Sequence, residues 1–409
     1  MPERQPPVLV VGGGPVGLLT AFRLRQSGLA CTVVEQDPWA LQRSRASTFQ
    51  PAVLDRLAAL DLAAPLVAAG VRVERIRSWD LGANRHQDLD YGLIAADTRH
   101  PYRLHVEQAA LRRLLLQRLR APGGPPVTLL EQHRVDLVDA NAAAEGVRLQ
   151  LRPLTGGDRT VQLSGRWLVM ADGARSTLRQ QLGLSFDGMD LPEPVLRLTL
   201  PELPEALRQQ LAGVTYIRAG NRSLSVLQMP DGWRLILRPD LQDCPQALAS
   251  DAWARTALAE LFDQLVEPGW WQTTPLHWDH YRVAQRCVPE RRVGAALVVG
   301  DAAHVTNTRG GLNMNFGLLE AMALAEALAC DSSADSNDRA LTAWALAWQA
   351  RTLDVLLPRT ARLLAGGTPL DGRNPAGAPE ATGASPTKAG HESRLRLQQA
   401  SLLDLIASP

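Results

Sequence analysis

The sequence predicts an α/β fold: a parallel-sheet domain with an inserted β-rich domain and a C-terminal helical region. Three observations predict it. The first 35 residues contain a strand, a glycine turn, a helix and a second strand. Two later apolar strands, at 168–171 and 295–299, lead into Asp172-Gly173 and Gly300-Asp301, respectively, and each is followed by a helix. Between them, short alternating stretches with turn residues are typical of antiparallel strands.

The composition limits the classes of function. The chain has 409 residues, of which 45% are apolar, enough for a large core and two joined domains. A net charge of +1 with 21% charged residues gives no sign of a nucleic-acid partner. Lys388 is the only lysine, so a mechanism that needs a buried catalytic lysine is excluded. No window approaches about 18 consecutive apolar residues, so no membrane-spanning helix is expected.

The four cysteines lie far apart and form no CxxC pair; they are Cys31, Cys244, Cys287 and Cys330. Neither a redox pair, a zinc ribbon nor a disulfide framework is therefore predicted, and no metal site is expected. This pattern fits a reducing cytoplasm. The short polar N-terminus is not expected to be a signal peptide.

The parallel-sheet domain is predicted to span 1–72, 98–182 and 285–365, and the β-rich domain 73–97 and 183–284. Within the latter, Ser223–Met229 and Trp233–Leu237 read as antiparallel strands around a Pro-Asp-Gly turn. A Gly-, Pro- and Ala-rich stretch, 366–390, reads as a linker. A C-terminal helix is expected over 391–409, with an apolar side that comprises Leu395, Leu402, Leu403 and Ile406.

The first motif is the GxGxxG of residues 12–17, placed between the first strand and the first helix. Gly12 allows the tight turn, Gly14 lets the backbone approach a pyrophosphate, and Gly17 lets the helix pack on the strand. The helix N-terminus offers free N–H groups and about half a unit of positive charge. Glu35 ends the second strand and is placed to accept hydrogen bonds from a ribose. Together these features predict a dinucleotide site and leave FAD and NAD open.

Two later motifs follow buried strands. In the first, a strand leads into Asp172-Gly173-Ala-Arg-Ser, with a short helical segment after it. In the second, a strand leads into Gly300-Asp301-Ala-Ala-His304. A loop with a glycine pair follows, and then an Ala- and Leu-rich helix that runs to about residue 329.

Together the three motifs resemble the signature set of the para-hydroxybenzoate hydroxylase-like FAD-dependent monooxygenases, in order and spacing, over roughly residues 8–360. The resemblance implies bound FAD and hydroxylation of a small aromatic substrate, phenolic or quinone-precursor-like, by O2. NAD(P)H would be a transient donor without a domain of its own, because no second fingerprint is present. The implied cycle is hydride transfer to FAD, formation of a C4a-hydroperoxyflavin and oxygen transfer to the substrate.

The resemblance also implies residue roles. Glu35 would bind the AMP ribose, Asp301 the ribityl hydroxyls, and Arg45 the region near the pyrophosphate. Gln108 matches a position at the ribityl-phosphate region, although a helical surface glutamine would look the same. Asp172 and Gly173 resemble a motif associated with the pyrophosphate and the nicotinamide donor. The full expected cofactor set is Gly12, Gly14, Gly17, Glu35, Arg45, Gln108, Asp172, Gly173, Gly300, Asp301, Gly311, Leu312, Asn313 and Met314.

The segment Gly310–Met314 is the expected mechanistic centre. A helix that begins there directs N–H groups and its positive end toward N1 and the C2 carbonyl of the isoalloxazine, where negative charge gathers on reduction. Gly310 and Gly311 would let the backbone reach the ring. The expected catalytic set is completed by Asn313 and His304, although support of the loop is the simpler role for His304.

The chain departs from the family in the loop after His304. Asn307, Thr308 and Arg309 stand where many relatives carry prolines, Asn313 where glycine is often seen, and Glu320 where an aspartate is usual. Because that loop backs onto substrate and flavin, these changes put the substrate in doubt rather than the cofactor. Candidates for the pocket on the β-rich domain are Tyr216, Arg218, Met229, Trp233, Arg234 and Arg238, and strand packing or a solvated face is the alternative for each.

Two other functions stay open. One is a reductase of isoprenoid double bonds on the same scaffold. The other is a flavin-binding accessory or maturation factor that docks on a macromolecular partner through the C-terminal segment. A homodimer is also left open. Disulfide reductases need a cysteine pair, and flavin-dependent halogenases need a buried lysine, so both fit poorly.

Overall fold

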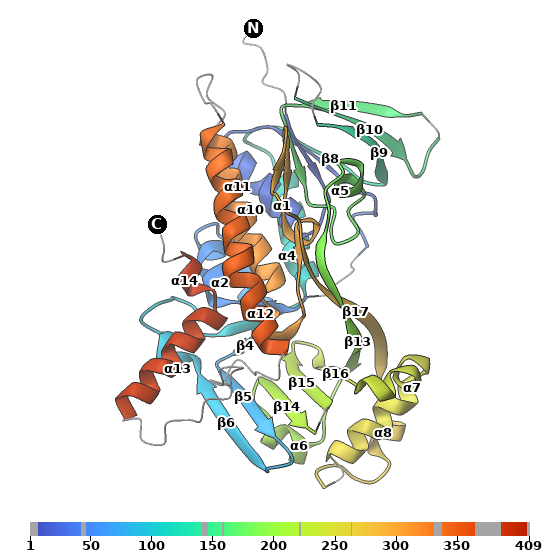
Figure 1. The fold of residues 1–409 in the computed structure, drawn as a ribbon, viewed down its shortest axis with the longest axis vertical. Coiled ribbons are helices and arrows are strands. Elements are labelled where there is room, and N and C mark those ends of the chain that lie inside the picture. The colour runs from blue at the N-terminus through green and yellow to red at the C-terminus, as the bar shows by residue number, and fades with distance from the viewer. Residues whose placement is uncertain are drawn as a thin grey trace.

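A computed structural model describes residues 7–41, 46–140, 146–157, 159–220, 222–262, 264–330, 338–364 and 386–406. Two large sheets lie one above the other along the long axis (Figure 1). The α/β prediction is confirmed. None of the described helices is both long and apolar enough to cross a membrane. The predicted linker lies outside the described residues over 366–385.

The upper sheet has six strands and is parallel except at one edge. Its order is β18 (Arg292–Val293), β19 (Ala296–Val298), β12 (Trp167–Met170), β1 (Val8–Val11), β2 (Cys31–Val34) and β8 (Val127–Leu130). Only β18 is antiparallel to its neighbour. Every residue of β1, β2 and β12 is buried, as expected for strands covered on both faces.

Helices cover one face of this sheet, and a smaller sheet covers the other. Val8 and Val10 face the helices, which are α1 (Pro15–Gln26), α4 (Gln108–Arg120), α10 (Asn313–Cys330) and α11 (Arg339–Arg351). Leu9 and Val11 face the antiparallel strands β9 (His133–Asp139), β10 (Val147–Pro153) and β11 (Val161–Gly165) and the helix α5 (Thr177–Gln181). The sequence did not predict this second sheet.

The lower sheet has eight strands from three separate stretches of chain. Its order is β20 (His304–Val305), β17 (His277–Cys287), β13 (Asp187–Leu200), β16 (Gly232–Arg238), β15 (Arg222–Met229), β14 (Val214–Ala219), β5 (Arg75–Asp80) and β6 (Arg85–Asp90). The predicted hairpin is confirmed, because β15 and β16 pair antiparallel around the turn at 230–231. One face packs on α6 (Glu205–Gln210), α7 (Cys244–Ala249), α8 (Asp251–Phe262) and α9 (Trp270–Thr273).

Short elements join the two sheets. A three-stranded sheet of β3 (Thr48–Phe49), β7 (Arg103–His105) and β4 (Val71–Val73) lies between them (Figure 1). Beside it are α2 (Pro51–Ala58), α3 (Ala63–Ala69) and the 3₁₀ turn η1 (Tyr91–Ile94). The helix α12 (Leu357–Leu364) continues from α11 through a π-helical turn, η6 (Thr352–Leu356).

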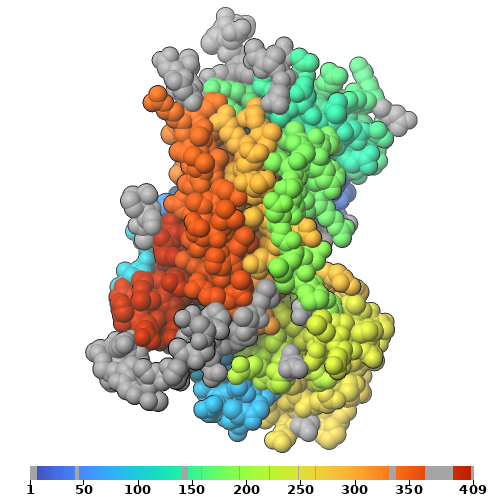
Figure 2. Space-filling view, viewed as in Figure 1, coloured from blue at the N-terminus to red at the C-terminus, as the bar shows by residue number. Residues whose placement is uncertain are grey.

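The C-terminal segment forms two helices, α13 (Pro386–Ala400) and α14 (Leu403–Ile406). Figure 2 shows them in red on the surface, beside the helices coloured orange. The expected linker end at 390 was wrong, because the helix begins at Pro386; a proline suits the first turn, whose N–H groups have no intrahelical partner. The expected apolar side was also partly wrong: Leu395 is exposed, whereas Leu397, Leu402 and Leu403 are buried.

Candidate functional site

Four loops meet at the carboxyl edge of the six-stranded sheet. Val11, at the end of β1, pairs with Val34 of β2 and with Met170 of β12. Met170 in turn pairs with Val298 of β19. Since these strands are parallel, the segments that follow them leave the sheet side by side. Those segments are the GxGxxG loop, the Glu35 turn, Asp172-Gly173 and Gly300-Asp301. This edge is where α/β folds bind dinucleotides.

The three fingerprint glycines have different surroundings. Gly12 has a φ of +111°, and a Cβ there would lie 2.2 Å from the carbonyl oxygen of Ala171. A Cβ on Gly17 would lie 2.0 Å from the carbonyl oxygen of Gly12. A Cβ on Gly14 would meet no protein atom within 4 Å. The fold itself therefore needs Gly12 and Gly17, whereas Gly14 presents bare backbone to open space at the start of α1.

The turn after β2 is fixed by Glu35. Its carboxylate accepts hydrogen bonds from the backbone N–H groups of Gly13 at 2.6 Å and of Asp37 at 2.8 Å. Each oxygen retains a lone pair for a further donor. Arg112 of α4 donates to the carbonyls of Gly13 and Trp39, both at 2.9 Å. Sequence reasoning missed Arg112, and its only signal is its position one helical turn after Gln108.

The Asp172-Gly173 turn contains an unsatisfied buried acceptor. Among the described residues, no group donates to Oδ1 of Asp172, although this atom is buried. Burial raises the pKa of Asp172, and a hydrogen bond from Ser176 opposes the shift. Arg179, which sequence reasoning also missed, donates to the carbonyls of Ala174 and Ala302, both at 2.9 Å. It thereby ties this turn to the Gly300-Asp301 loop.

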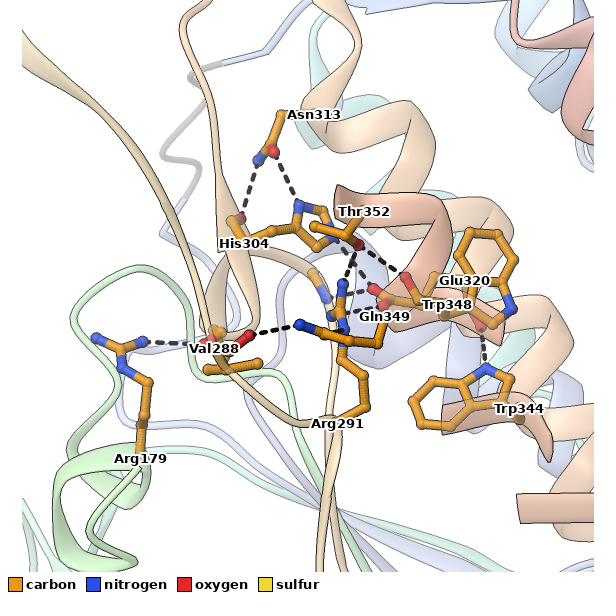
Figure 3. Close-up of polar contacts among 12 residues, drawn as sticks. Arg179, Val288, Arg291, His304, Asn313, Glu320, Trp344, Trp348, Gln349 and Thr352 are labelled. Atoms are coloured by element: carbon orange, nitrogen blue, oxygen red, sulfur yellow. Dashed lines mark hydrogen bonds and ion pairs between the residues drawn. The ribbon is translucent and has the colours of Figure 1, made fainter. Parts of the chain in front are cut away.

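A chain of polar contacts runs from Asp301 through Asn313 into the core, and Figure 3 shows the part of it from Asn313 through His304 to Glu320. The amide of Asn313, the first residue of α10, donates to Asp301 at 2.8 Å. Its oxygen lies 2.9 Å from Nδ1 of His304, whose Nε2 lies 3.3 Å from Glu320. His304 is fully buried. In this position it supports Asn313, the simpler of the two roles expected for it.

Glu320 contacts two buried groups in the core, the backbone N–H of Gly300 and the guanidinium of Arg291. Its Oε2 accepts from the backbone N–H of Gly300 at 2.8 Å, and its Oε1 lies 2.6 Å from Nη1 of Arg291. Burial alone would raise the pKa of Glu320, but Arg291 and His304 hold it below its usual value. The longer side chain at this position, in place of the family aspartate, thus takes part in a buried ion pair. Sequence reasoning missed Arg291.

The glycine-pair loop is tightly held. Gly310 and Gly311 have φ values of +78° and +64°, which side chains rarely adopt. Gln50 donates to the carbonyl of Gly310 at 2.8 Å. Asn315 donates to the carbonyls of Gly311 at 2.7 Å and Thr48 at 2.8 Å. With these carbonyls bound from behind, the 18-residue helix α10 starts directly after the loop and gives it a positive end.

The remaining predicted positions are less decisive. Arg45 lies outside the described residues. Gln108 opens α4, and its side chain accepts a long hydrogen bond, 3.4 Å, from the N–H of Ala46. Leu312 is buried in the upper core, and Met314 packs against it. Leu312 is therefore suited to contact a ligand through its backbone, whereas the side chain of Met314 is only partly buried.

The unusual loop residues bind α12 and the lower sheet. Asn307 donates to the carbonyl of Thr360 at 2.7 Å, and Arg309 donates to that of Leu363 at 2.9 Å. Thr308 accepts from Arg238 at 3.1 Å. These contacts within the protein are sufficient to explain why this loop carries polar residues, and no ligand is needed to explain them.

Of the six pocket candidates, Met229 is buried and Arg238 is the donor to Thr308, and the other four fall into three groups. Tyr216 and Arg234 lie in a buried cluster on the face of the lower sheet that turns toward β7. Arg218 is half exposed and pairs with Asp80 at 2.6 Å. Trp233 packs on the lower core, on the opposite face, because side chains alternate along a strand.

The edge fits FAD. Gly14 offers bare backbone beside a helix N-terminus, Glu35 retains acceptors, and the buried Oδ1 of Asp172 awaits a donor. The glycine pair then brings backbone to the positive end of a long helix. A dinucleotide with a flavin at one end would use all four features.

Comparisons with known proteins agree. Residues 5–345 match the family described as FAD binding domain. The chain is 34% identical over 339 residues to the para-nitrophenol 4-monooxygenase of Pseudomonas sp. (strain WBC-3), which covers 78% of this chain and 77% of that protein. It is 28% identical to the pentachlorophenol 4-monooxygenase of Sphingobium chlorophenolicum, over 78% of this chain and 57% of that protein.

The fold also matches solved structures. A crystal structure of p-nitrophenol 4-monooxygenase PnpA from Pseudomonas putida superposes with a TM-score of 0.76 at 25% identity, and covers 98% of this chain and 96% of that one. The resemblance found in the motifs is thereby confirmed. The chain belongs to the para-hydroxybenzoate hydroxylase-like family of FAD-dependent aromatic monooxygenases.

Proposed function

We propose that this protein hydroxylates a small substituted phenol with NAD(P)H and O2. The net reaction converts the phenol, O2, NAD(P)H and a proton into the hydroxylated product, NAD(P)⁺ and water. The observation that carries the proposal is the meeting of three glycine-bearing loops with the positive end of α10 at one sheet edge. Two similar proteins are named for nitrophenol and pentachlorophenol, which supports a phenol as the substrate class.

The first loop and Glu35 would hold the AMP half of FAD. The open backbone at Gly14 and the start of α1 would receive the pyrophosphate. Glu35, already fixed by two backbone N–H groups, would accept from the ribose hydroxyls. Asp301 would accept from the ribityl hydroxyls, because the contact with Asn313 keeps its carboxylate in one orientation.

The glycine-pair loop would act at the pyrimidine edge of the flavin. When bound, FAD supplies the redox chemistry: it takes a hydride from the nicotinamide and passes one oxygen atom of O2 to the substrate. The N–H groups at the start of α10 would stabilise negative charge there, an effect of about 0.3–2 kcal/mol for one helix terminus. Asn315 and Gln50 hold the loop so that this charge is met without reorganisation.

The proposal is tested with purified, FAD-loaded protein and a set of small phenols. We expect one or more phenols to accelerate NAD(P)H oxidation and to gain one oxygen atom by mass, with label from ¹⁸O₂. NAD(P)H oxidation that proceeds equally fast without oxygen would instead support the reductase of the same fold. A protein that stays colourless with excess FAD would overturn both readings.

One observation weakens the accessory-factor alternative. Of the apolar residues expected on the docking side of this segment, Leu402 and Leu403 are buried against the protein's own helices, whereas Leu395 is exposed. We also assign the reaction to the cytoplasm, because all four cysteines lie in the described chain as free thiols. Whether the enzyme works as a homodimer is tested by light scattering of the FAD-loaded protein.

A further inference from the structure

A cluster of charged side chains lies buried beside the glycine-pair loop. We name it the arginine cluster, and it consists of Arg103, His105, Glu107 and Arg234. Arg103 and His105 stand on one face of β7, with Leu104 in the upper core on the other. Their strand lies between the two large sheets, next to β4 (Figure 1). Thr48, which pairs with His105, would lie 3.1 Å from a Cβ added to Gly311.

The arginines reach the cluster from opposite sides. Arg103 is 1% exposed, donates to the hydroxyl of Tyr91, and donates to that of Tyr216 at 2.8 Å. Arg234 comes from β16 of the lower sheet, is 7% exposed and pairs with Glu107. Arg103 links the three-stranded sheet to the lower sheet, and Arg234 links the lower sheet to the start of α4, so the cluster occupies the junction between the two parts of the fold.

Several donors in this cluster have no acceptor. Among the described residues, nothing accepts from Nη2 of Arg103 or from Nε and Nη1 of Arg234, although all three atoms are buried. Buried guanidinium donors without partners are costly, so native proteins normally satisfy them. In the described chain, three donor nitrogens of this cluster without an acceptor stand against one buried carboxylate oxygen without a donor, Oε2 of Glu107, and they therefore indicate an oxygen-bearing ligand.

The charge of the cluster is also uncompensated. Burial lowers the pKa of His105 to about 4, so the imidazole is neutral at pH 7. The guanidinium groups of Arg103 and Arg234 then face one carboxylate, that of Glu107, which pairs with Arg234, so the cluster has one net positive charge. Tyr91 stays neutral too, because burial raises its pKa to about 12. One buried positive charge favours a ligand with one negative charge.

His105 adds an acceptor. Its Nδ1 lies 2.9 Å from the carbonyl oxygen of Gln228, which can only accept, so Nδ1 carries the proton. Nε2 of the neutral ring therefore has a free lone pair, and no described group donates to it. The site thus combines guanidinium donors for an anionic oxygen with an acceptor for a hydroxyl group.

We infer that the arginine cluster is the specificity site for the aromatic substrate and binds a single anionic oxygen group on its ring, a phenolate or a carboxylate. His105 would accept from a second hydroxyl. This inference rests on the proposed function, since it places the ring beside the Gly310–Gly311 loop. Arg103 carries the uncompensated charge, and Tyr91 and Tyr216 position it.

The test compares anionic and neutral ligands on FAD-loaded protein without NAD(P)H, by the change in flavin absorbance on titration. The anions are benzoate and 4-nitrophenolate, and their neutral partners are benzamide and 4-nitroanisole. Arg103→Met removes the uncompensated charge and keeps the Arg234–Glu107 pair. We expect it to raise the Kd of the anions about ten- to a hundredfold and that of the neutral ligands less than threefold. Arg103→Lys should recover part of the loss.

Three results are decisive. A loss for benzoate alone or 4-nitrophenolate alone identifies the anion as carboxylate or phenolate. An equal loss for anionic and neutral ligands, or no loss, overturns the inference. Arg208→Met, on the exposed face of α6, is the matched control, and bound FAD together with the melting temperature verifies the fold of each variant. If the wild-type enzyme hydroxylates phenols but Arg103→Met binds the anions with normal affinity, the arginine cluster is not the anion site. The proposed function is then unaffected.

Discussion

The cofactor edge and the arginine cluster are built from different material. The edge is formed mainly by backbone atoms, at glycines, helix N-termini and strand ends. Side chains such as Gln50 and Arg112 fix this backbone by hydrogen bonds to its carbonyl groups. In the arginine cluster, side chains from separate elements converge and several of their polar atoms are unused. The first arrangement suits one fixed cofactor. The second suits a ligand that can change between related enzymes while the backbone stays the same.

The largest effects should come from substitutions of two glycines with different roles at the cofactor edge, Gly12, which the fold requires, and Gly14, which faces open space. Gly12→Ala would force a positive φ and a Cβ 2.2 Å from a carbonyl oxygen, so we expect a loss of about 3–5 kcal/mol in the free energy of unfolding. Gly14→Ala fits its φ of −73° and meets no protein atom. It should leave the apoprotein as stable and lower FAD affinity at least a hundredfold.

These outcomes are measured by denaturant unfolding of apoprotein and by FAD titration. If Gly14→Ala bound FAD with normal affinity, the pyrophosphate would not lie against the backbone of Gly14. The proposed position of FAD at this edge would then be wrong. If Gly12→Ala were as stable as wild type, the backbone there would be less constrained than the contacts require.

The next largest effect concerns acid and the arginine cluster. His105 has a pKa of about 4 in the folded protein and about 6.5 when unfolded, so between these values only the unfolded chain binds the proton. Stability must therefore fall as pH decreases from about 6.5 to 4, by about 3 kcal/mol from this group. Denaturant unfolding at several pH values measures it, without aromatic ligand.

His105→Gln is the matched variant, because glutamine can still donate to the carbonyl of Gln228 but does not titrate. We expect the difference in stability between wild type and variant to shrink steadily as the pH falls. A constant difference across this range would mean that His105 is protonated in the folded state. The cluster would then hold two uncompensated charges instead of one.

A smaller effect is expected at Asn313, the first residue of α10, on the reduction potential of bound FAD. Asn313→Asp places a second carboxylate beside Asp301, at the end of α10 that meets the flavin. Added negative charge there should lower the two-electron reduction potential of bound FAD by about 30 mV, equivalent to about 1.4 kcal/mol. Asn313→Ala removes the same hydrogen bonds without adding charge and should shift the potential less than half as much. Equal shifts would show that geometry, not charge, sets the potential.

The sequence predicted the edge well because its parts are local. Each motif is a short run at the end of a buried strand, and adjacent parallel strands bring such runs together. The supporting side chains could not be predicted in the same way. Arg112 and Arg179 bind backbone carbonyls 99 and 123 residues away, and carbonyls leave no trace in a sequence pattern.

The arginine cluster was predicted only in part. Tyr216 and Arg234 were pocket candidates, but Arg103 and His105 were not among them. Their partners lie 113 and 123 residues away along the chain, so only the fold brings them together. The C-terminal helices show a related limit. A single helix through 391–406 places Leu395 inside, but the chain breaks at Leu402, with a φ of +60°, and Leu397 is buried instead.

The smallest effect should mark where the arginine cluster ends. Arg218 stands two residues after Tyr216 on the same face of β14, but its side chain is 51% exposed and pairs with Asp80. Because water already solvates this pair, Arg218→Ala should change the Kd of benzoate and 4-nitrophenolate less than twofold. Tyr216→Phe removes an acceptor from Arg103, and it should raise the Kd of both anions about two- to tenfold. The same flavin-absorbance titration measures both variants. If Arg218→Ala weakened anion binding as much as Arg103→Met, long-range charge along the strand would explain the preference, and contact with the buried guanidinium groups would not.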